Sequence, residues 1–93
     1  YGLAVTRERL RQVETAEAVL RERGFREFRV RHHGEVARLE IARAELPRAV
    51  EQAAELAARI REIGFRRVLL DVEGYRRGAL NEGLRLVELG GAR

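Results

Sequence analysis

Three arginines and a histidine near the middle of the chain have the residue types of an anion-binding site. They are Arg29, Arg31, Arg38 and His33. Residues 25–32 alternate between apolar and polar side chains, and residues 36–41 do so again, which is typical of two β-strands. Arginine presents a planar fork of donors that binds phosphate, sulfate or carboxylate through two parallel hydrogen bonds. The chemistry predicted here is therefore recognition of an oxyanion.

The turn between these strands decides which side chains share a face. Gly34-Glu35 suits the two central positions of a tight hairpin turn. That turn pairs Arg31 with Arg38 and Arg29 with Glu40. One face then carries the apolar residues Phe28, Val30, Leu39 and Ile41, and the other carries Arg29, Arg31, Arg38 and Glu40. Because the alternation agrees on both strands, the register is well specified.

Two interpretations of the polar face are open. Arg29 can pair with Glu40, but Arg31 opposes Arg38, and like charges directly across a ladder are destabilising. An anion bound between them would relieve this repulsion, with His33 beside it. Alternatively, the arginines splay apart on a solvated face, where charge pairs contribute only about 0–1 kcal/mol.

Neither a metal site nor a complete catalytic set is predicted. His32 and His33 are adjacent on a strand and point to opposite faces, so they cannot chelate one ion together. No third ligand stands at a recognisable spacing. Glu17 lies near the apolar seam of a predicted helix. It is either at the edge of that seam, with Ala16 facing the core, or directed at a site.

Composition bounds the class of protein. The 93 residues allow one small domain. The net charge is +4 and all 19 basic residues are arginine, which alone gives only weak support to nucleic-acid binding. The absence of cysteine excludes a disulfide, a thiolate metal site or a cysteine nucleophile within these residues. No apolar run approaches a membrane span and no signal peptide is visible, so we expect a cytoplasmic protein.

The periodicity predicts an α-β-β-α-β order. Thr6 can cap a first helix that Gly24 ends, and a second helix starts near Leu46 and ends at Gly64. A strand follows over residues 65–71, and residues 82–93 form a short helix or a frayed tail. Residues 20–26 and 60–66 resemble each other, as a duplicated unit or a linker used twice. We expect an α+β domain, an incomplete ferredoxin-like fold with a small mixed or antiparallel sheet and two helices on one face.

Several segments together resemble a known family. They are Tyr1-Gly2 with Val5-Thr6 and Ala16-Glu17, Gly24 to Gly34, Ala37 to Ile41, Gly64 to Asp71, and Gly74 to Asn81. In this order and spacing they resemble the C-terminal domain of LarE-type ATP-dependent sacrificial sulfur transferases, members of the PP-loop ATPase superfamily. The likeness covers residues 1–81. The last segment departs from the family pattern, because it reads GYRRGALN where the family has GYRSGSMN.

The resemblance implies a function for a larger protein. In this family an N-terminal PP-loop domain, absent from this chain, uses ATP and Mg²⁺ to adenylylate a carboxylate of a pyridinium mononucleotide. A cysteine just before the C-terminal domain, or an iron–sulfur cluster, supplies sulfur for a nickel-pincer cofactor. The resemblance assigns an auxiliary catalytic role to Glu17 and phosphate binding to Arg29 and Arg31. It also implies an N-terminal domain partner, a homo-oligomer and a phosphate-bearing substrate, with no cofactor bound by this chain itself.

Two other functions are compatible with the sequence. One is a nucleic-acid-binding module of a tRNA-thiolating enzyme, which the small number of aromatic residues disfavours. The other is a plain oligomerisation domain. The salt dependence of binding distinguishes them, because contact with many phosphates weakens steeply as salt rises and contact with one does not.

Overall fold

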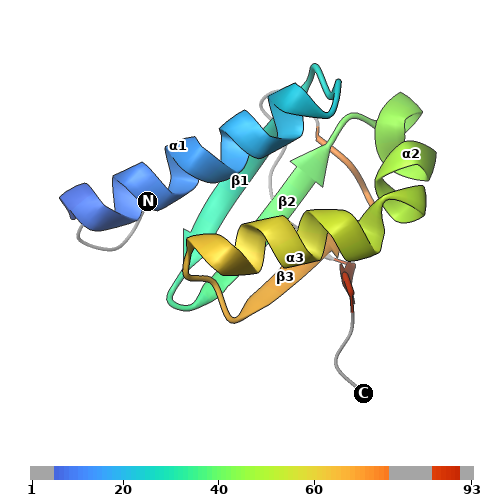
Figure 1. Cartoon of the computed structure of the whole chain (residues 1–93). Coiled ribbons are helices and arrows are strands. Elements are labelled where there is room, and N and C mark those ends of the chain that lie inside the picture. Colours follow the sequence, from blue (N-terminus) through green and yellow to red (C-terminus); the bar gives the residue numbers. More distant parts are fainter. Residues whose placement is uncertain (1–5, 76–84, 91–93) are drawn as a thin grey trace.

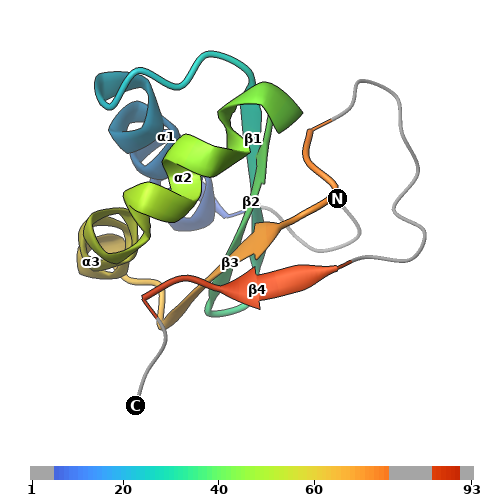
Figure 2. The same ribbon diagram turned by 90° about the vertical axis from the view of Figure 1, so that its right-hand side faces the viewer.

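The structure, a computed structural model, describes residues 6–75 and 85–90 of the chain. Its elements in chain order are α1 (Arg7–Glu22), β1 (Phe28–His33), β2 (Val36–Ile41), the 3-10 turn η1 (Arg43–Glu45), α2 (Leu46–Glu51), α3 (Ala53–Ile63), β3 (Arg67–Asp71) and β4 (Leu86–Glu88). The strands form one sheet in the order β1-β2-β3-β4. Only β2 and β3 are parallel (Figure 1). The helices lie on one side of this sheet (Figure 2), so the predicted α+β fold with a small mixed sheet is confirmed.

The first helix begins and ends at the residues that the sequence indicates. The hydroxyl of Thr6 accepts the backbone N–H of Arg9 at 3.0 Å, which satisfies one of the free donors of the first turn. At the other end Gly24 has a φ of 90°, a conformation that favours glycine, and its N–H donates to the carbonyl of Arg21. These two contacts set the length of α1 and turn the chain towards β1.

The hairpin register agrees with the prediction at every pair. Arg29 lies opposite Glu40, Val30 opposite Leu39 and Arg31 opposite Arg38. Val30, Leu39 and Ile41 are fully buried beneath the helices, whereas Phe28 is partly buried and packs against the rim of the core. The core is the space between the sheet and α1 and α3, and the arginines of β1 and β2 lie on the other face of the sheet.

Two expectations about the second half of the chain were wrong. The single helix predicted from Leu46 to Gly64 is two helices, because the backbone at Gln52 leaves the helical region, with φ −96° and ψ 15°. The helix or frayed tail predicted after residue 82 contains the strand β4 instead. The backbone of β4 pairs with β3, and the next residue, Leu89, is buried and donates its N–H to Val68 at 2.8 Å. Tertiary pairing thus overrides a weak local preference.

Candidate anion-binding site on the open face of the sheet

The predicted anion-binding residues lie together on the open face of the sheet, opposite the helices. Arg29, Arg31 and His33 alternate along β1, and Arg38 lies directly across from Arg31 on β2. Each of them points away from the core because it stands between core-facing residues on a pleated strand. The structure therefore brings together the four residues that the sequence predicted for this site.

Glu40 connects two of the arginines. A single carboxylate oxygen, Oε2, accepts a hydrogen bond from Nε of Arg31 at 3.0 Å and another from Nη2 of Arg38 at 2.9 Å. Arg38 and Glu40 are only 6% and 5% exposed, so this ion pair is shielded from water. The repulsion expected between Arg31 and Arg38 is relieved by a residue of the protein itself. The sequence had assigned Glu40 to Arg29 and did not predict this arrangement.

The arginine cluster retains unused hydrogen-bonding capacity. Nε of Arg38 is buried and has no hydrogen-bond partner among the described residues. Buried polar atoms in native proteins nearly always have a partner, so an orphaned guanidinium donor calls for an explanation. Nearby Asp71, only 3% exposed, lies beside Glu40 on β3 and accepts the backbone N–H of Glu73 at 2.9 Å. The carboxylates of Glu40 and Asp71 therefore lie on the same face as the arginine cluster.

The two histidines are separated as predicted. Burial, followed by the positive charges of Arg38 and Arg31, lowers the pKa of His33, while Glu40 acts in the opposite direction. His32 is on the helix side, where its Nε2 is 2.8 Å from the side-chain oxygen of Gln12. In the part of the chain that the structure describes, no three His, Cys, Asp or Glu side chains are grouped to hold a metal ion.

Glu17 is not part of the arginine cluster within this chain. It lies on α1, half-buried, next to Ala16, whose side chain faces the core with no exposure. Because α1 covers the opposite face of the sheet from Arg29, the two residues are on different sides of the domain. The position agrees with the edge of the helix seam, and a role for Glu17 in a site stays a prediction.

Sequence reasoning missed Tyr75 at the border of the cluster. The guanidinium carbon of Arg29 is 5.7 Å from the centroid of the Tyr75 ring, a cation–π geometry. The backbone N–H of Tyr75 donates to the carbonyl of Ile41 at 2.9 Å, which fixes this segment at the end of β2. The only sequence signal for it was the Gly74-Tyr75 pair of the family-like ending. Residues 76–81 of that ending, and residues 1–5 at the other end of the resemblance, lie outside the described residues.

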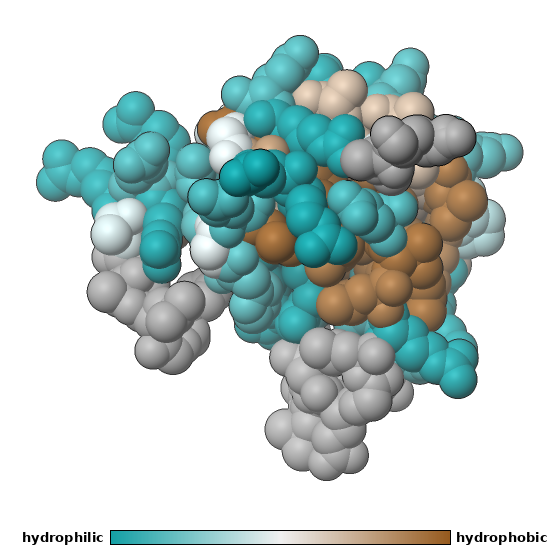
Figure 3. All heavy atoms as spheres, turned by 90° about the horizontal axis from the view of Figure 1, so that it is seen from below, coloured by the Kyte–Doolittle hydropathy of each residue, from teal (hydrophilic) through white to brown (hydrophobic). Residues whose placement is uncertain are grey.

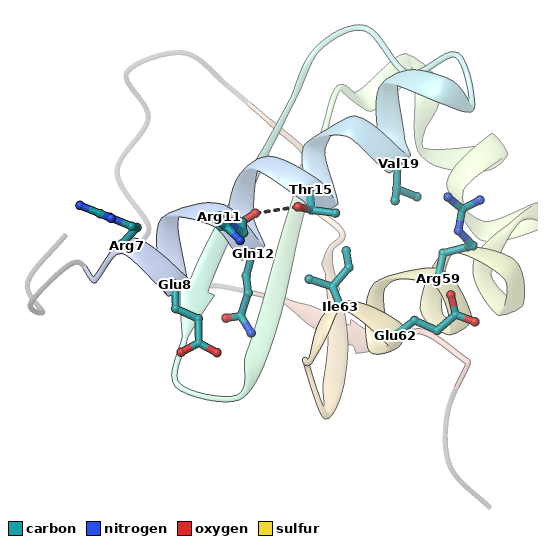
Figure 4. Close-up of a pocket in the computed structure, with 9 residues that line it drawn as sticks. All are labelled: Arg7, Glu8, Arg11, Gln12, Thr15, Val19, Arg59, Glu62 and Ile63. Carbon is teal, nitrogen blue, oxygen red and sulfur yellow. Dashed lines mark hydrogen bonds between the residues drawn. The ribbon is translucent and has the colours of Figure 1, made fainter.

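A separate hollow lies between α1 and α3. Its volume is about 820 Å³, and Figure 4 shows side chains from both helices around it. Those residues are Arg7, Glu8, Arg11, Gln12, Thr15, Val19, Arg59, Glu62 and Ile63. The hollow includes none of the arginine cluster and mixes both signs of charge. It gives no chemical reason to prefer it as the functional site.

Apolar side chains are also exposed on the surface. Figure 3 shows apolar surface gathered on one side of the molecule. In β4, Leu86 is 40% exposed and Val87 49% exposed. Within residues 6–75 and 85–90, no helix is long and apolar enough to cross a bilayer.

Two known proteins are similar in sequence to nearly the whole of this chain. The chain is 35% identical over 89 residues to pyridinium-3,5-bisthiocarboxylic acid mononucleotide synthase of Lactiplantibacillus plantarum, a match over 96% of the chain. It is 37% identical over 86 residues to an uncharacterized protein of Synechocystis sp., a match over 90% of the chain. The chain spans about a third of either protein, 32% in each case. No family model matches the sequence.

Proposed function

Because this chain belongs to the LarE-like sulfur transferases and is similar to their C-terminal domain, we propose that it holds the phosphate of a mononucleotide substrate during sulfur transfer. The phosphate binds over Arg29 and Arg31, with Arg38 and His33 assisting. The product of the whole protein is a thiocarboxylated precursor of a nickel-pincer type of cofactor. The thiocarboxylated mononucleotide in this proposal is the product that the name of the plantarum relative gives for that protein, and the nickel-pincer cofactor is what the family resemblance implies.

The observation that carries this proposal is the buried ion pair around Glu40. One carboxylate oxygen holds both Arg31 and Arg38, which limits the rotamers available to both guanidiniums. A preorganised guanidinium loses less conformational entropy when an anion binds. The second feature is the Nε of Arg38, a buried guanidinium donor that has no partner among the described residues. An ordinary solvated arginine face needs neither feature.

The remaining steps belong to other parts of the protein. In this proposal ATP and Mg²⁺ act in an N-terminal PP-loop domain. Glu17 lies on α1, on the other side of the sheet from the cluster, so any auxiliary catalytic role requires that it enter a site formed with the N-terminal domain or a neighbouring subunit. A homo-oligomer provides such a neighbour. This chain contributes phosphate binding and assembly, and no adenylylation step.

Thermal unfolding in phosphate tests the proposed site. A ligand that binds only the folded state stabilises it by RT ln(1 + [L]/Kd), about 2.7 kcal/mol at a hundredfold excess over Kd. For a domain of this size about 1 kcal/mol raises Tm by roughly 4–8 °C. Phosphate is compared with chloride at equal ionic strength, which removes general screening. We expect the phosphate-specific shift to be lost in Arg29→Gln and Arg31→Gln.

The matched control is Arg66→Gln. Arg66 is a surface arginine with a side chain 77% exposed, paired with Glu35 outside the cluster. It should keep the full phosphate shift. Equal shifts in all four proteins, repeated in the full-length parent, would mean that the cluster is ordinary surface charge. A steep salt dependence with an oligonucleotide in place of phosphate would favour nucleic-acid binding instead.

A further inference from the structure

Tyr75 places an aromatic ring beside the arginine cluster by means of a constrained backbone. Gly74, the residue before it, has a φ of 85°. A Cβ at this position would lie 3.0 Å from the carbonyl oxygen of Ile41 and 3.1 Å from Cγ of Arg43. This close approach allows the N–H of Tyr75 to reach Ile41 at 2.9 Å. The ring is thus anchored to β2, the strand that also carries Arg38 and Glu40.

The ring of Tyr75 already binds a cation. The Arg29 guanidinium lies 5.7 Å from its centroid, and the face of an aromatic ring attracts planar cations through its quadrupole. Arg29 is also one of the two residues proposed to bind phosphate. A single arginine therefore connects an aromatic surface with an anion site. This is the arrangement that a ligand with a cationic ring at one end and a phosphate at the other would need.

We propose that Tyr75 binds the pyridinium ring of the mononucleotide whose phosphate binds Arg29 and Arg31. The inference rests on the proposed function. When the phosphate engages Arg29, the guanidinium leaves the ring of Tyr75, and the pyridinium ring takes its place. One cation replaces another on the same aromatic surface, and the phosphate compensates the displaced arginine. Tyr75 is then a specificity residue, which selects pyridinium mononucleotides over sugar phosphates.

Three probes separate the ring from the phosphate. Nicotinamide mononucleotide carries a pyridinium ring and a phosphate, its reduced form carries an uncharged ring, and ribose 5-phosphate has no ring. Titration calorimetry on the full chain measures the Kd of each. We expect nicotinamide mononucleotide to bind roughly three- to thirtyfold more tightly than the other two, the range of a cation–π contact.

Variants of Tyr75 test whether its ring causes the tighter binding of nicotinamide mononucleotide. Tyr75→Phe should keep this preference, because the aromatic face remains. Tyr75→Leu should abolish it, so that oxidised and reduced nicotinamide mononucleotide bind equally. Tyrosine fluorescence, followed in a Tyr1→Phe background so that Tyr75 is the remaining tyrosine, should be quenched by the pyridinium ring. If Tyr75→Leu does not fold, the comparison of oxidised and reduced mononucleotide in the unmodified chain still decides.

The outcomes distinguish the two proposals. If ribose 5-phosphate does not bind the unmodified chain, the phosphate site is absent and both proposals are overturned. If ribose 5-phosphate binds but the oxidised mononucleotide has no advantage over the reduced one, the phosphate site stands and the assignment of Tyr75 is wrong. An advantage that survives in Tyr75→Leu overturns the assignment as well.

Discussion

The turn from α1 into β1 and the turn from α3 into β3 are built in the same way. Gly24 and Gly64 both have positive φ values, 90° and 132°, and each donates its N–H at 3.0 Å to the carbonyl of an arginine three residues earlier. The phenylalanine that follows, Phe25 or Phe65, is 2% exposed in both. The two turns differ in what they lead to. The strand after the first turn is at the edge of the sheet and carries the arginines, and the strand after the second lies inside the sheet.

This comparison separates the roles of shared and unshared residues. The glycine and phenylalanine are common to both turns and only direct a strand beneath its helix. The residues that differ lie further along the strands, where Arg29 and Arg31 of β1 correspond to Leu69 and Asp71 of β3. The shared pattern therefore carries the fold, and the candidate function depends on open-face residues outside it.

Removal of either phenylalanine should have the largest effect. The guanidinium carbon of Arg48 lies 4.7 Å from the ring centroid of Phe25. The ring centroids of Phe65 and His32 are 5.0 Å apart. Phe25→Ala and Phe65→Ala should each lower the free energy of unfolding by about 3–5 kcal/mol in urea titrations. Val50→Ala, at a residue 62% exposed, should change it by less than about 0.5 kcal/mol. A small loss at one phenylalanine alone would break the equivalence of the turns.

The two glycines should show a smaller and graded effect. An L-residue in a left-handed conformation costs about 1–2 kcal/mol, so Gly24→Ala and Gly64→Ala should both destabilise. Gly64→Ala should cost more, because its φ is more extreme and the new Cβ would be 2.7 Å from Nε2 of Gln12, the partner of His32.

Gly34→Ala measures the strain alone. Gly34 has a φ of 62° and no atom near the position of an added Cβ. Subtracting its effect in urea titrations leaves the steric part at each turn. Equal losses at Gly24 and Gly64 would contradict the larger cost expected at Gly64.

The caps of the two helices should differ. The side chain of Thr6 caps α1, whereas Gln52 makes no side-chain cap for α3. Thr6→Ala should lower stability by about 1 kcal/mol, and Gln52→Ala should have little effect. Thermal melts followed by circular dichroism measure both. Equal losses of stability in the two variants would show that α1 and α3 do not differ in their N-terminal caps.

The smallest expected effect is a dependence of stability on pH, caused by His32, which lies on β1 and contacts Phe65 of the second turn. Burial, with smaller effects of Arg9 and His33, lowers the pKa of His32 below its usual value of 6.5. Between the lowered pKa of the folded chain and the usual value of 6.5, the unfolded chain binds more protons than the folded one. The contribution of neutral His32 to the free energy of unfolding is therefore fully present above about pH 6.5 and is lost as the pH drops. Urea titrations from pH 7.5 to 5 should show this slope, and His32→Gln should reduce it. An unchanged slope would assign the effect to His33 or to carboxylates.

The sequence was sufficient for features that depend on strict periodicity. Alternation on two strands joined by a two-residue turn permits one register, so the pairs from Phe28 to Ile41 and the core face were predictable. The strand at Leu86 was not, because three residues have too little intrinsic preference to override their pairing with β3. The position of Tyr75 depends on a turn closed by Gly74 against another strand, a contact that is not local in sequence.

The candidate site was predictable only as a set of residues. The pattern places Arg29, Arg31 and Arg38 on one face but does not decide which of them Glu40 contacts. Several rotamers of a glutamate reach neighbouring strands, and burial of the pair selects among them. Sequence reasoning therefore found the members of the cluster, whereas the sharing of one carboxylate oxygen between two arginines required the structure.

The edge position of β1 has a consequence for self-association. In the described part of the sheet the outer side of β1 has no neighbouring strand, and such an edge is a template for aggregation. A symmetric antiparallel pairing of two copies of β1 must keep the same face outward on both. If such a pairing is centred on Arg29, Val30 or Arg31, an arginine of one copy lies opposite an arginine or a histidine of the other. This contact between like charges is unfavourable. The side chains proposed to bind substrate also act as gatekeepers, and a bound polyvalent anion that neutralises them would remove this protection against aggregation.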